Sequence, residues 1–431
     1  MSKIKYPSLA QEGKKKIKWA EEHMPLLRLI KNRFEKQKPF LGCKIGIALH
    51  IEKKTANLIQ TLAAGGATVV ASSCNPNTTD DAVAAALATQ NNINIFAWSK
   101  QTKEEYYWCL KQVCKTKPNL IIDDGNDLVT LIHNKFRYLI HQKILIGGCE
   151  ETTTGVKRLK AMEKEKKLLF PMIAVNDAYS KYLLDNQFGT AQSTIDAIVN
   201  GLNLLIAGKT VVVLGYGWCG RGIASRMRAL GANVVVVEVK GYASNGPEPG
   251  EIKALQALYD GYMVLNHMQA AKIGDIFICA TGNKNVLRKE HFLEMKDGAI
   301  LANAGHFDVE IDKKALFSLA QHVRTVFDGV EEFTLQNKKR LYLLSEGRLV
   351  NLAKPLGQGH PIEIMDGSFA LQALCLEYLL KNKNKLKKAL YLVPAQIDRQ
   401  VASLILESHN IFLDELTPEQ KQYLESWEGG T

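Results

Sequence analysis

Short apolar runs alternate with amphipathic stretches over most of this chain, and this alternation restricts the fold more than any other feature of the sequence. The first half has five apolar runs that are predicted to be strands, at residues 44–49, 67–72, 93–98, 119–124 and 143–148. Helical periodicity fills the stretches between them, such as 53–64 and 80–90. Strand–helix alternation implies right-handed crossovers, so the sequence predicts an α/β fold with a parallel, doubly wound sheet.

A second series of the same kind follows a long helical pattern at about residues 190–207. Its predicted strands are residues 209–217, 233–239, 275–282 and 299–305. We therefore predict a second doubly wound domain and place the change between the two domains near residues 186–192. The tract after about residue 352 is predicted to be helical, and the Gly/Pro-rich residues 241–250 are predicted to form a loop.

Composition narrows the class of protein. The 431 residues include 55 Lys and Arg against 44 Asp and Glu, a formal charge of +11. Lysines gather at residues 14–18 and 381–388, but the second group has no interleaved aromatic residues. We therefore expect solvated helix faces and no nucleic-acid partner. No uninterrupted apolar run approaches the ~18 residues of a membrane span, and the first residues are lysine-rich rather than apolar, so we expect neither a membrane association nor a signal peptide.

The eight cysteines are scattered along the chain with no C-x-x-C pair and no zinc-ligand spacing. This pattern is typical of reduced thiols, so we expect a cytoplasmic protein without disulfides and without a metal ion.

A dinucleotide-binding loop is predicted at the start of the second series. Gly215, Gly217 and Gly220 follow the apolar strand of residues 209–214 and open a helical pattern. Gly215 permits a tight turn, Gly217 lets the backbone approach a pyrophosphate, and Gly220 permits close helix–strand packing. Glu238 ends the next strand, where an acidic side chain binds the adenosine ribose and repels a 2′-phosphate. The sequence therefore favours NAD over NADP.

Polar residues follow the predicted strands of the first domain, at the edge of the sheet where ligands of doubly wound folds bind. They are His50, Asn75, Asp123, Asp124, Glu150, Glu151, Thr152, Thr153 and Thr154. Any one of the Asp, Asn or Thr residues is equally well explained as the N-cap of the next helix. The whole set on one rim favours a binding site.

Lys181 and Asp185 are four residues apart on a predicted helix. They form either a surface ion pair or a buried pair in the cleft. In the second case, we expect desolvation to lower the pKa of Lys181 and make it a base.

Several motifs together resemble the S-adenosyl-L-homocysteine hydrolase family over nearly the whole chain; they include SSCNPNTTDD, IIDDGNDL, CEETTTGVKRL, VNDAYSKYLLDN, NAGHFDVEID and GHPIEIMDGSF. The resemblance implies a substrate domain of residues 1–188 and 352–395, a Rossmann NAD domain of residues 189–351, hinges between the two, and a short helical C-terminal segment of residues 396–431. It also implies a homotetramer and a small nucleoside thioether substrate.

The reaction implied by the resemblance is reversible hydrolysis of S-adenosyl-L-homocysteine to adenosine and homocysteine. Tightly bound NAD oxidises the ribose 3′-hydroxyl, the C4′ hydrogen is removed, homocysteine leaves, water adds at C5′, and the ketone is reduced again. The catalytic residues implied are His50, Asp124, Glu151, Lys181, Asp185, Asn186 and His306. Of these, Lys181 with Asp185 handles the 3′-hydroxyl proton, Asp124 the C4′ proton, and the two histidines the leaving group and the attacking water.

The resemblance also implies two sets of binding residues. Those for the cofactor are Thr152, Thr153, Thr154, Gly215, Gly217, Trp218, Cys219, Gly220, Glu238, Thr281, Ala304, Gly305, His306 and Asn351. Those for the substrate are Glu52, Lys54, Thr55, Asp124, Glu151, Lys181, Asp185 and His360.

Glu52 and Lys54 depart from the pattern of many adenosine-handling members, which have a Thr and a Gln or Glu at these positions. Adenine presents a 6-amino donor and an N1 acceptor, whereas hypoxanthine presents a 6-oxo acceptor and an N1–H donor. A Lys donor with a Glu acceptor complements hypoxanthine, so S-inosyl-L-homocysteine stays open as an alternative substrate. In the other interpretation, Lys54 is a solvated residue at a helix start.

Further departures concern the cofactor site. Trp218-Cys219 replaces the Asp-Val common in the glycine loop, and Thr190 stands where many members have Cys. The insertion at 240–251 displaces a segment that normally touches the NAD ribose. The chain ends at Thr431 without the Lys/Tyr-bearing tail of many members, so we expect weaker retention of the cofactor.

Two other functions are alternatives to the hydrolase. A catalytically silent NAD-binding regulator of the same fold is expected to lose acid/base residues, yet the implied set is complete. A dehydrogenase with net redox turnover explains the glycine loop but leaves residues 151–154 and the Lys181/Asp185 pair unused. The sequence therefore favours the hydrolase.

Overall fold

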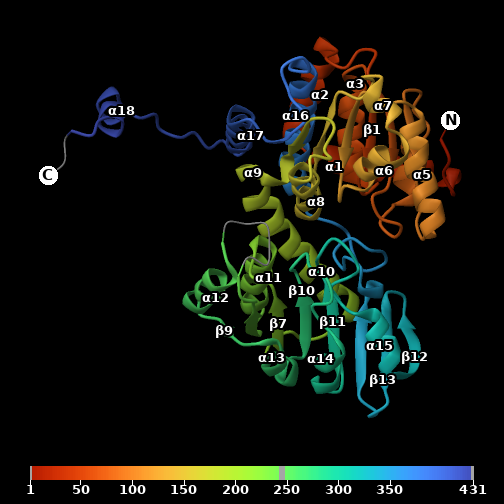
Figure 1. The fold of residues 1–431 in the computed structure, drawn as a ribbon, viewed down its shortest axis with the longest axis vertical. Coiled ribbons are helices and arrows are strands. Elements are labelled where there is room, and N and C mark those ends of the chain that lie inside the picture. The colour runs from red at the N-terminus through yellow and green to blue at the C-terminus, as the bar shows by residue number, and fades with distance from the viewer. Residues whose placement is uncertain (1, 242–247, 429–431) are drawn as a thin grey trace.

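The computed structural model describes residues 2–241 and 248–428 and contains two sheets with helices on their faces (Figure 1). The first sheet has seven strands, all parallel, in the order β3-β2-β1-β4-β5-β6-β15. They are β1 Lys44–Ala48, β2 Thr68–Ser72, β3 Ile93–Phe96, β4 Leu120–Asp123, β5 Gly147–Glu150, β6 Met172–Ala174 and β15 Leu390–Leu392. The direction of winding reverses between β1 and β4, and ligands of such sheets bind at this switch point.

The second sheet has eight strands in the order β9-β8-β7-β10-β11-β14-β13-β12. They are β7 Thr210–Leu214, β8 Asn233–Val237, β9 Met263–Val264, β10 Ile276–Cys279, β11 Ala299–Asn303, β12 Ala320–Phe327, β13 Val330–Leu335 and β14 Arg340–Leu344. Neighbouring strands are parallel from β9 at one edge of the sheet through β8, β7, β10 and β11 to β14. Strand β13 pairs antiparallel with both β14 and β12. Here the switch point lies between β7 and β10.

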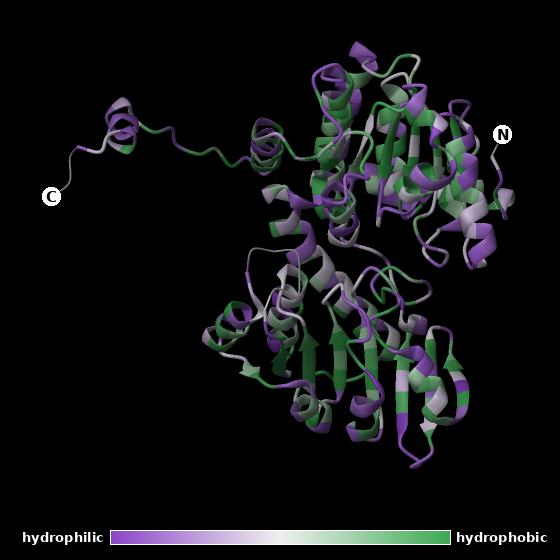
Figure 2. Cartoon of the chain, viewed as in Figure 1, coloured by the Kyte–Doolittle hydropathy of each residue, from purple (hydrophilic) through white to green (hydrophobic). Residues whose placement is uncertain are grey.

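Helices cover both faces of each sheet because the central strands are apolar on both sides. Figure 2 shows the central strands of the second sheet, such as β7 and β10, almost uniformly hydrophobic, whereas the edge strands β12 and β13 mix hydrophobic and polar residues. The α-helices are α1 Ala10–Glu22, α2 Pro25–Gln37, α3 Lys53–Ala64, α4 Asp81–Leu87, α5 Lys103–Lys115, α6 Asp127–Lys135, α7 Tyr138–His141, α8 Thr153–Lys164, α9 Tyr179–Lys181, α10 Thr190–Leu202, α11 Trp218–Ala229, α12 Gly250–Tyr259, α13 His267–Ile273, α14 Lys289–Glu294, α15 Lys313–Leu319, α16 Ile362–Lys381, α17 Ala395–Ser408 and α18 Pro418–Glu425. A π-helix, η3 Tyr182–Gly189, joins α9 to α10, and short 3₁₀ helices lie at η1 Pro7–Leu9, η2 Val175–Asp177 and η4 Ser345–Gly347.

The predicted fold class is confirmed: the chain is an α/β protein with two doubly wound, parallel-rich sheets. Some elements differ from the predictions. β5 begins at Gly147 because residues 144 and 145 turn back to bond the Leu139 carbonyl oxygen. The helix predicted over 190–207 ends at Leu202, where Asn203 adopts a left-handed φ of 50°.

The antiparallel ribbon β12–β14 and the strand β15 were not predicted, and β15 interrupts the tract after residue 352 that was expected to be helical. The domain limits at residues 188, 351 and 395 stay a prediction. Residues 242–247 of the predicted loop lie outside the described residues. Among the residues that the structure describes, no helix combines the length and the apolar character that crossing a membrane requires.

Candidate active site

A cavity of about 620 Å³ lies where the carboxyl ends of the two sheets face each other. It is lined by residues that follow β1 and β4 of the first sheet and β7, β10 and β11 of the second. A smaller cavity of about 290 Å³ adjoins it and is lined by Gly215, Gly217, Glu238 and Thr281. Of the site residues predicted from the sequence, all line one of these cavities except Gly220, Asn75, Asp123 and Glu150.

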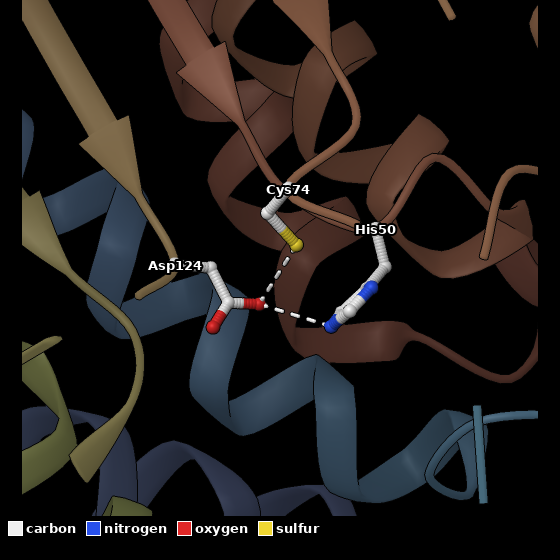
Figure 3. A group of neighbouring side chains, drawn as sticks. All are labelled: His50, Cys74 and Asp124. Atoms are coloured by element: carbon white, nitrogen blue, oxygen red, sulfur yellow. Dashed lines mark hydrogen bonds and ion pairs between the residues drawn. The ribbon is translucent and has the colours of Figure 1, made fainter. Parts of the chain in front are cut away.

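Asp124 is the centre of the first cluster in the large cavity (Figure 3). Its Oδ2 lies 3.2 Å from Nε2 of His50 and accepts a hydrogen bond of 3.4 Å from the Cys74 thiol. Its Oδ1 lies 3.6 Å from Nδ1 of His306. Two imidazoles and a thiol therefore meet one carboxylate, at the switch point of the first sheet.

The protonation of this cluster follows from its burial. Desolvation lowers the pKa of His50 to about 4, although Asp124 opposes the change, so His50 is neutral at pH 7. The neutral ring places Nε2–H toward the carboxylate, which leaves Nδ1 to accept from the Thr78 hydroxyl at 2.7 Å. Burial and Asp124 raise the pKa of the Cys74 thiol well above its ordinary value.

His50, Cys74 and Asp124 present ligand atoms within 4.8 Å of one another, a spacing that a metal ion can bridge. The sequence did not indicate this group, since the three residues lie on different loops. A raised thiol pKa opposes metal binding because the thiolate is the ligand. The absence of a metal stays a prediction.

Two buried carboxyls hold the loop that carries Asp124. Asp123 accepts from the amide N–H groups of Asp124 at 3.0 Å and Val129 at 2.8 Å, and Glu150 accepts from that of Gly125 at 2.9 Å. Burial raises the pKa of Asp123 to about 7 and that of Glu150 well above its ordinary value. These two residues, predicted on the rim, therefore lie beneath it and position the loop.

Lys181 is the centre of a second cluster and is only 4% exposed. Its Nζ donates to Oδ1 of Asn186 at 2.9 Å and lies 3.5 Å from both Asp185 Oδ2 and Glu151 Oε1. The pair is buried in the cavity, but the expected fall in the pKa of Lys181 is wrong. Burial alone lowers this pKa, whereas Asp185 and Glu151 outweigh the burial and raise it. Lys181 is therefore an ammonium group at neutral pH.

The carboxyls beside Lys181 differ in protonation. Burial raises the pKa of Glu151 to about 8, although Lys181 opposes the rise. Burial also acts to raise the pKa of Asp185, but Lys181 and His360 together lower it below its ordinary value; His360 Nδ1 lies 2.7 Å from Asp185 Oδ1. Asp185 is thus the lasting counter-ion, and Glu151 is the group that changes protonation near neutral pH.

The π-helix explains why Asn186 joins this cluster. In a π-helix, residues five apart are neighbours, so Lys181 reaches Asn186 more closely than it reaches Asp185. Asn186 Nδ2 in turn donates to Thr153 Oγ1 at 3.2 Å and to Asn176 Oδ1 at 3.1 Å. Thr153, one of the threonines predicted at the cofactor, is therefore linked through Asn186 to Lys181.

Glu52 and Lys54 form another wall of the cavity at the start of α3. Lys54 is only 2% exposed, so its interpretation as a solvated residue is wrong. Its Nζ lies 3.1 Å from Glu52 Oε2 and donates to the carbonyl oxygens of His360 at 2.8 Å and Gln358 at 3.3 Å. An ammonium group thus covers two backbone acceptors.

The glycine loop has the geometry of a dinucleotide site. Gly215 has a φ of 97°, and the helix α11 begins after Gly217 without a side-chain cap. A Cβ at Gly217 would meet no atom within 4 Å, which leaves open space for a pyrophosphate at the helix N-terminus. A Cβ at Gly220 would lie 1.8 Å from the Gly215 carbonyl oxygen, so Gly220 is a packing residue. Glu238 Oε1 accepts from the Tyr216 amide at 2.6 Å and lines the smaller cavity.

Other groups also fit NAD. The buried Oδ1 of Asn351 has no hydrogen-bond partner among the described residues and lies at the large cavity. Two of the departures from the family pattern contact each other, since Cys219 donates to Thr190 Oγ1 at 3.5 Å. The Trp218 ring lies between Tyr182, at 5.3 Å, and the Arg221 guanidinium, at 4.6 Å, beside the cavity.

Some residues at the site were not predicted. They are Cys74 and Thr78 beside His50, Lys157 and Lys253 in the cavity wall, and Ser368 and Gln372 on α16. The last two had a signal in the sequence, because they are the polar residues, four apart, of the apolar stretch 367–376. Asn75, predicted on the rim, instead accepts from the Asn77 amide in a local turn and lines neither cavity.

The fold and the site define an NAD-binding enzyme in which a doubly wound cofactor sheet faces a second sheet that carries acid/base residues. Comparison with known proteins gives the family. Residues 1–146 match the model "S-adenosyl-L-homocysteine hydrolase", and residues 186–357 match "S-adenosyl-L-homocysteine hydrolase, NAD binding domain". The chain belongs to the S-adenosyl-L-homocysteine hydrolase family and is an adenosylhomocysteinase-type hydrolase.

Relatives carry two names at similar identity. The chain is 54% identical to the S-inosyl-L-homocysteine hydrolase of Methanocaldococcus jannaschii over the whole of both chains. It is 52% identical to the S-inosyl-L-homocysteine hydrolase of Methanopyrus kandleri over 99% of this chain and 98% of the relative. It is also 52% identical to the adenosylhomocysteinase of Saccharolobus solfataricus over 100% of this chain and 99% of the relative. Overall identity therefore does not select the base of the substrate.

Proposed function

We propose that this enzyme hydrolyses S-inosyl-L-homocysteine to inosine and homocysteine in preference to the adenosyl thioether. The observation that carries the proposal is the buried Lys54 ammonium on the carbonyl oxygens of Gln358 and His360. Two free carbonyl oxygens form an acceptor site, which suits a 6-amino group. With Lys54 on them, both oxygens are occupied, and this end of the cavity presents the ammonium itself, whose third N–H, directed toward Glu52, suits a 6-oxo group.

Glu52 supports the same assignment. Its carboxylate lies 3.1 Å from the Lys54 ammonium, so a donor and an acceptor stand side by side in the cavity wall. Hypoxanthine offers the complementary pair, an O6 acceptor and an N1–H donor. With adenine, the 6-amino donor would face the Lys54 donor. A site built for one hydrogen-bond pattern rejects the other strongly, because its buried polar groups are left unpaired.

The residues around the ribose are assigned to the steps of the family reaction. NAD, when bound, would supply a hydride acceptor for the 3′-carbon and the hydride donor for the final reduction. In this assignment, the Lys181 ammonium donates a hydrogen bond to the 3′-oxygen. It can accept the proton of the 3′-hydroxyl only after it has given one of its own protons to another group. Glu151 Oε1, 3.5 Å away and without a hydrogen-bond partner among the described residues, is placed to accept that proton.

Asp124 is assigned to the C4′ proton, because its carboxylate lies between two imidazoles that have no other charged partner within the cluster. His50 and His306 are assigned to the leaving sulfur and the attacking water. A neutral His50 is able to accept a proton at Nδ1, which faces the Thr78 hydroxyl, and to pass its Nε2 proton to Asp124.

We also propose a homo-oligomer, in keeping with the predicted tetramer, and a cytoplasmic location. The segment that follows α17 and carries α18 extends away from the two sheets (Figure 1). It exposes large apolar side chains, including Phe412 at 78% and Trp427 at 93%, and a second copy of the chain is the partner proposed to cover them. Sedimentation of the purified protein tests the assembly, and a monomer at micromolar concentration would contradict it.

The proposed cytoplasmic location has its own support. All eight cysteines are free thiols, which supports a reducing compartment.

The substrate assignment is tested by initial rates of thiol release from each thioether separately, with the protein as purified and no added NAD. The proposal predicts release from the inosyl compound without net change at the NADH absorbance band. Faster release from the adenosyl compound contradicts the assignment of the base. A strict need for stoichiometric added NAD contradicts the internal redox cycle and favours a dehydrogenase.

A further inference from the structure

Helix α16 has a buried stretch, residues 367–376, in which two polar side chains one turn apart stand among apolar residues beneath the active site. Ser368 is 1% exposed and Gln372 is 0% exposed. The helix packs against β5, which Glu151 directly follows, and against the π-helix, which carries Asp185. Met365 and Phe369 of the same helix line the large cavity.

Each of these two side chains donates to one carboxyl beside Lys181. Ser368 Oγ donates to Asp185 Oδ2 at 2.7 Å, and Gln372 Nε2 donates to Glu151 Oε2 at 2.5 Å. Glu151 Oε1, the atom on the side of Lys181, is left for that lysine. Ser368 and Gln372 thus each hold one of the two carboxyls, and Lys181 lies between these carboxyls, 3.5 Å from each.

The other end of the Gln372 amide is also informative. Its Oε1 is buried and has no hydrogen-bond partner among the described residues. An amide beside a carboxyl serves both protonation states, since N–H donates to the carboxylate and, after rotation, C=O accepts from the acid. An apolar residue of the same size would serve neither state.

We propose that Ser368 and Gln372 are positioning residues of the reaction, with Ser368 orienting Asp185 and Gln372 controlling the orientation and the charge of Glu151. The inference rests on the proposed roles of Lys181, Glu151 and Asp185. Gln372 stabilises the charged form of Glu151 against its burial. Removing the amide therefore raises the pKa of Glu151 further, so a higher pH is needed to ionise it.

The first test does not depend on the substrate. Melting temperatures of the wild type and of Gln372→Leu are measured between pH 5 and pH 9. The variant is expected to lose more stability at pH 9, where Glu151 is charged, than at pH 5, where it is neutral. In a Glu151→Gln background this pH dependence disappears. A loss that is equal at all pH values in both backgrounds overturns the role of Gln372.

The second test uses the reaction. For Gln372→Leu, kcat/KM is expected to fall about tenfold or more, with the acidic limb of its pH profile moved to higher pH. For Ser368→Ala, kcat is expected to fall about tenfold while KM and the limb stay near the wild-type values, because Asp185 remains charged beside Lys181. Wild-type kinetics and an unmoved profile in both variants overturn the proposal.

The matched control is Asp366→Asn. Asp366 lies on the same helix and is also buried, but its carboxylate accepts from the amides of Leu26 and Leu27, away from Lys181. This variant is expected to lower the melting temperature and to leave the pH profile of kcat/KM unchanged. A shift equal to that of Gln372→Leu would show a general effect of α16 and overturn the inference. Failure of the wild type to hydrolyse either thioether contradicts the proposed function instead, and leaves the melting experiment to decide the role of Gln372.

Discussion

The ammonium nitrogen of Lys54 lies 2.8 Å from the main-chain oxygen of His360, 306 residues further along the chain, and the imidazole of the same histidine lies 2.7 Å from Asp185. His360, in the segment between the two sheets, thus contacts both Lys54 and Asp185. Its backbone holds the lysine proposed to bind the base, and its side chain holds the counter-ion of the lysine proposed to act at the ribose. The two proposed roles are therefore linked through one short segment.

Replacing Lys54 by Met should change the choice of base. The substitution removes the donor proposed for O6 and frees the carbonyl oxygens of Gln358 and His360 for a 6-amino group. We expect the ratio of kcat/KM for the inosyl over the adenosyl thioether to fall about tenfold or more, measured by thiol release. The neighbouring Lys53→Met is the control, because Lys53 has the same charge and lines neither cavity. An unchanged ratio in Lys54→Met would exclude its role in selectivity.

Asp124→Asn should abolish most of the activity and leave the cofactor bound. The amide keeps the shape of the side chain but cannot accept the C4′ proton, so we expect thiol release to fall about 10²-fold or more. Bound NAD, measured after acid release from the purified variant, should match the wild type because Asp124 lies at the end of β4, in the first sheet. A variant with near-normal turnover would remove Asp124 from the proposed mechanism.

Two glycines of the same loop should fail in different ways when changed to Ala. A methyl group at Gly217 would clash with no protein atom but would lie in the space proposed for the pyrophosphate, so Gly217→Ala should fold normally and bind NAD about tenfold more weakly or worse. Gly220→Ala places its methyl group against the Gly215 carbonyl oxygen, so it should lower the melting temperature strongly. Cofactor content and melting temperature are measured together. Equal cofactor affinity in Gly217→Ala and the wild type would contradict the assignment of the pyrophosphate site.

Glu150→Gln should stabilise the protein in alkaline solution. Burial raises the pKa of Glu150, so its contribution to stability is present below the ordinary carboxyl pKa and is lost as the pH rises through the raised value. A Gln retains an oxygen for the amides of Gly125 and Thr152 and carries no charge. The difference in melting temperature between variant and wild type should therefore grow in favour of the variant from pH 5 to pH 9. A constant difference would mean that Glu150 has an ordinary pKa.

The sequence predicted those parts of the molecule that depend on local pattern. The apolar runs at β1 and β7 are strands because β-branched residues pack on both faces of a covered sheet, and the glycine loop lies where the strand order reverses. Lys181 and Asp185 meet in the cavity as the resemblance implied. The local pattern could not predict how deeply each charged side chain is buried or which charged groups surround it.

Three features depended on contacts between distant parts of the chain. Lys54 has a sequence setting typical of a solvated helix start, and its burial results from backbone carbonyls that follow the second domain. The pKa of Lys181 rises rather than falls because two carboxyls outweigh desolvation, a balance that requires distances. The edge strand β15 is three residues long and, among the described strands, pairs with β6 alone. A strand this short has too few residues for a periodic pattern that would predict it.

The most direct test of the central claim is an internal competition. S-inosyl- and S-adenosyl-L-homocysteine are mixed in equal concentration with the purified enzyme and no added NAD, and the inosine and adenosine formed early in the reaction are separated by chromatography. Their ratio gives the ratio of the two kcat/KM values. The buried Lys54 and Glu52 predict an inosine-to-adenosine ratio of about ten or more. A product mixture dominated by adenosine would contradict the account.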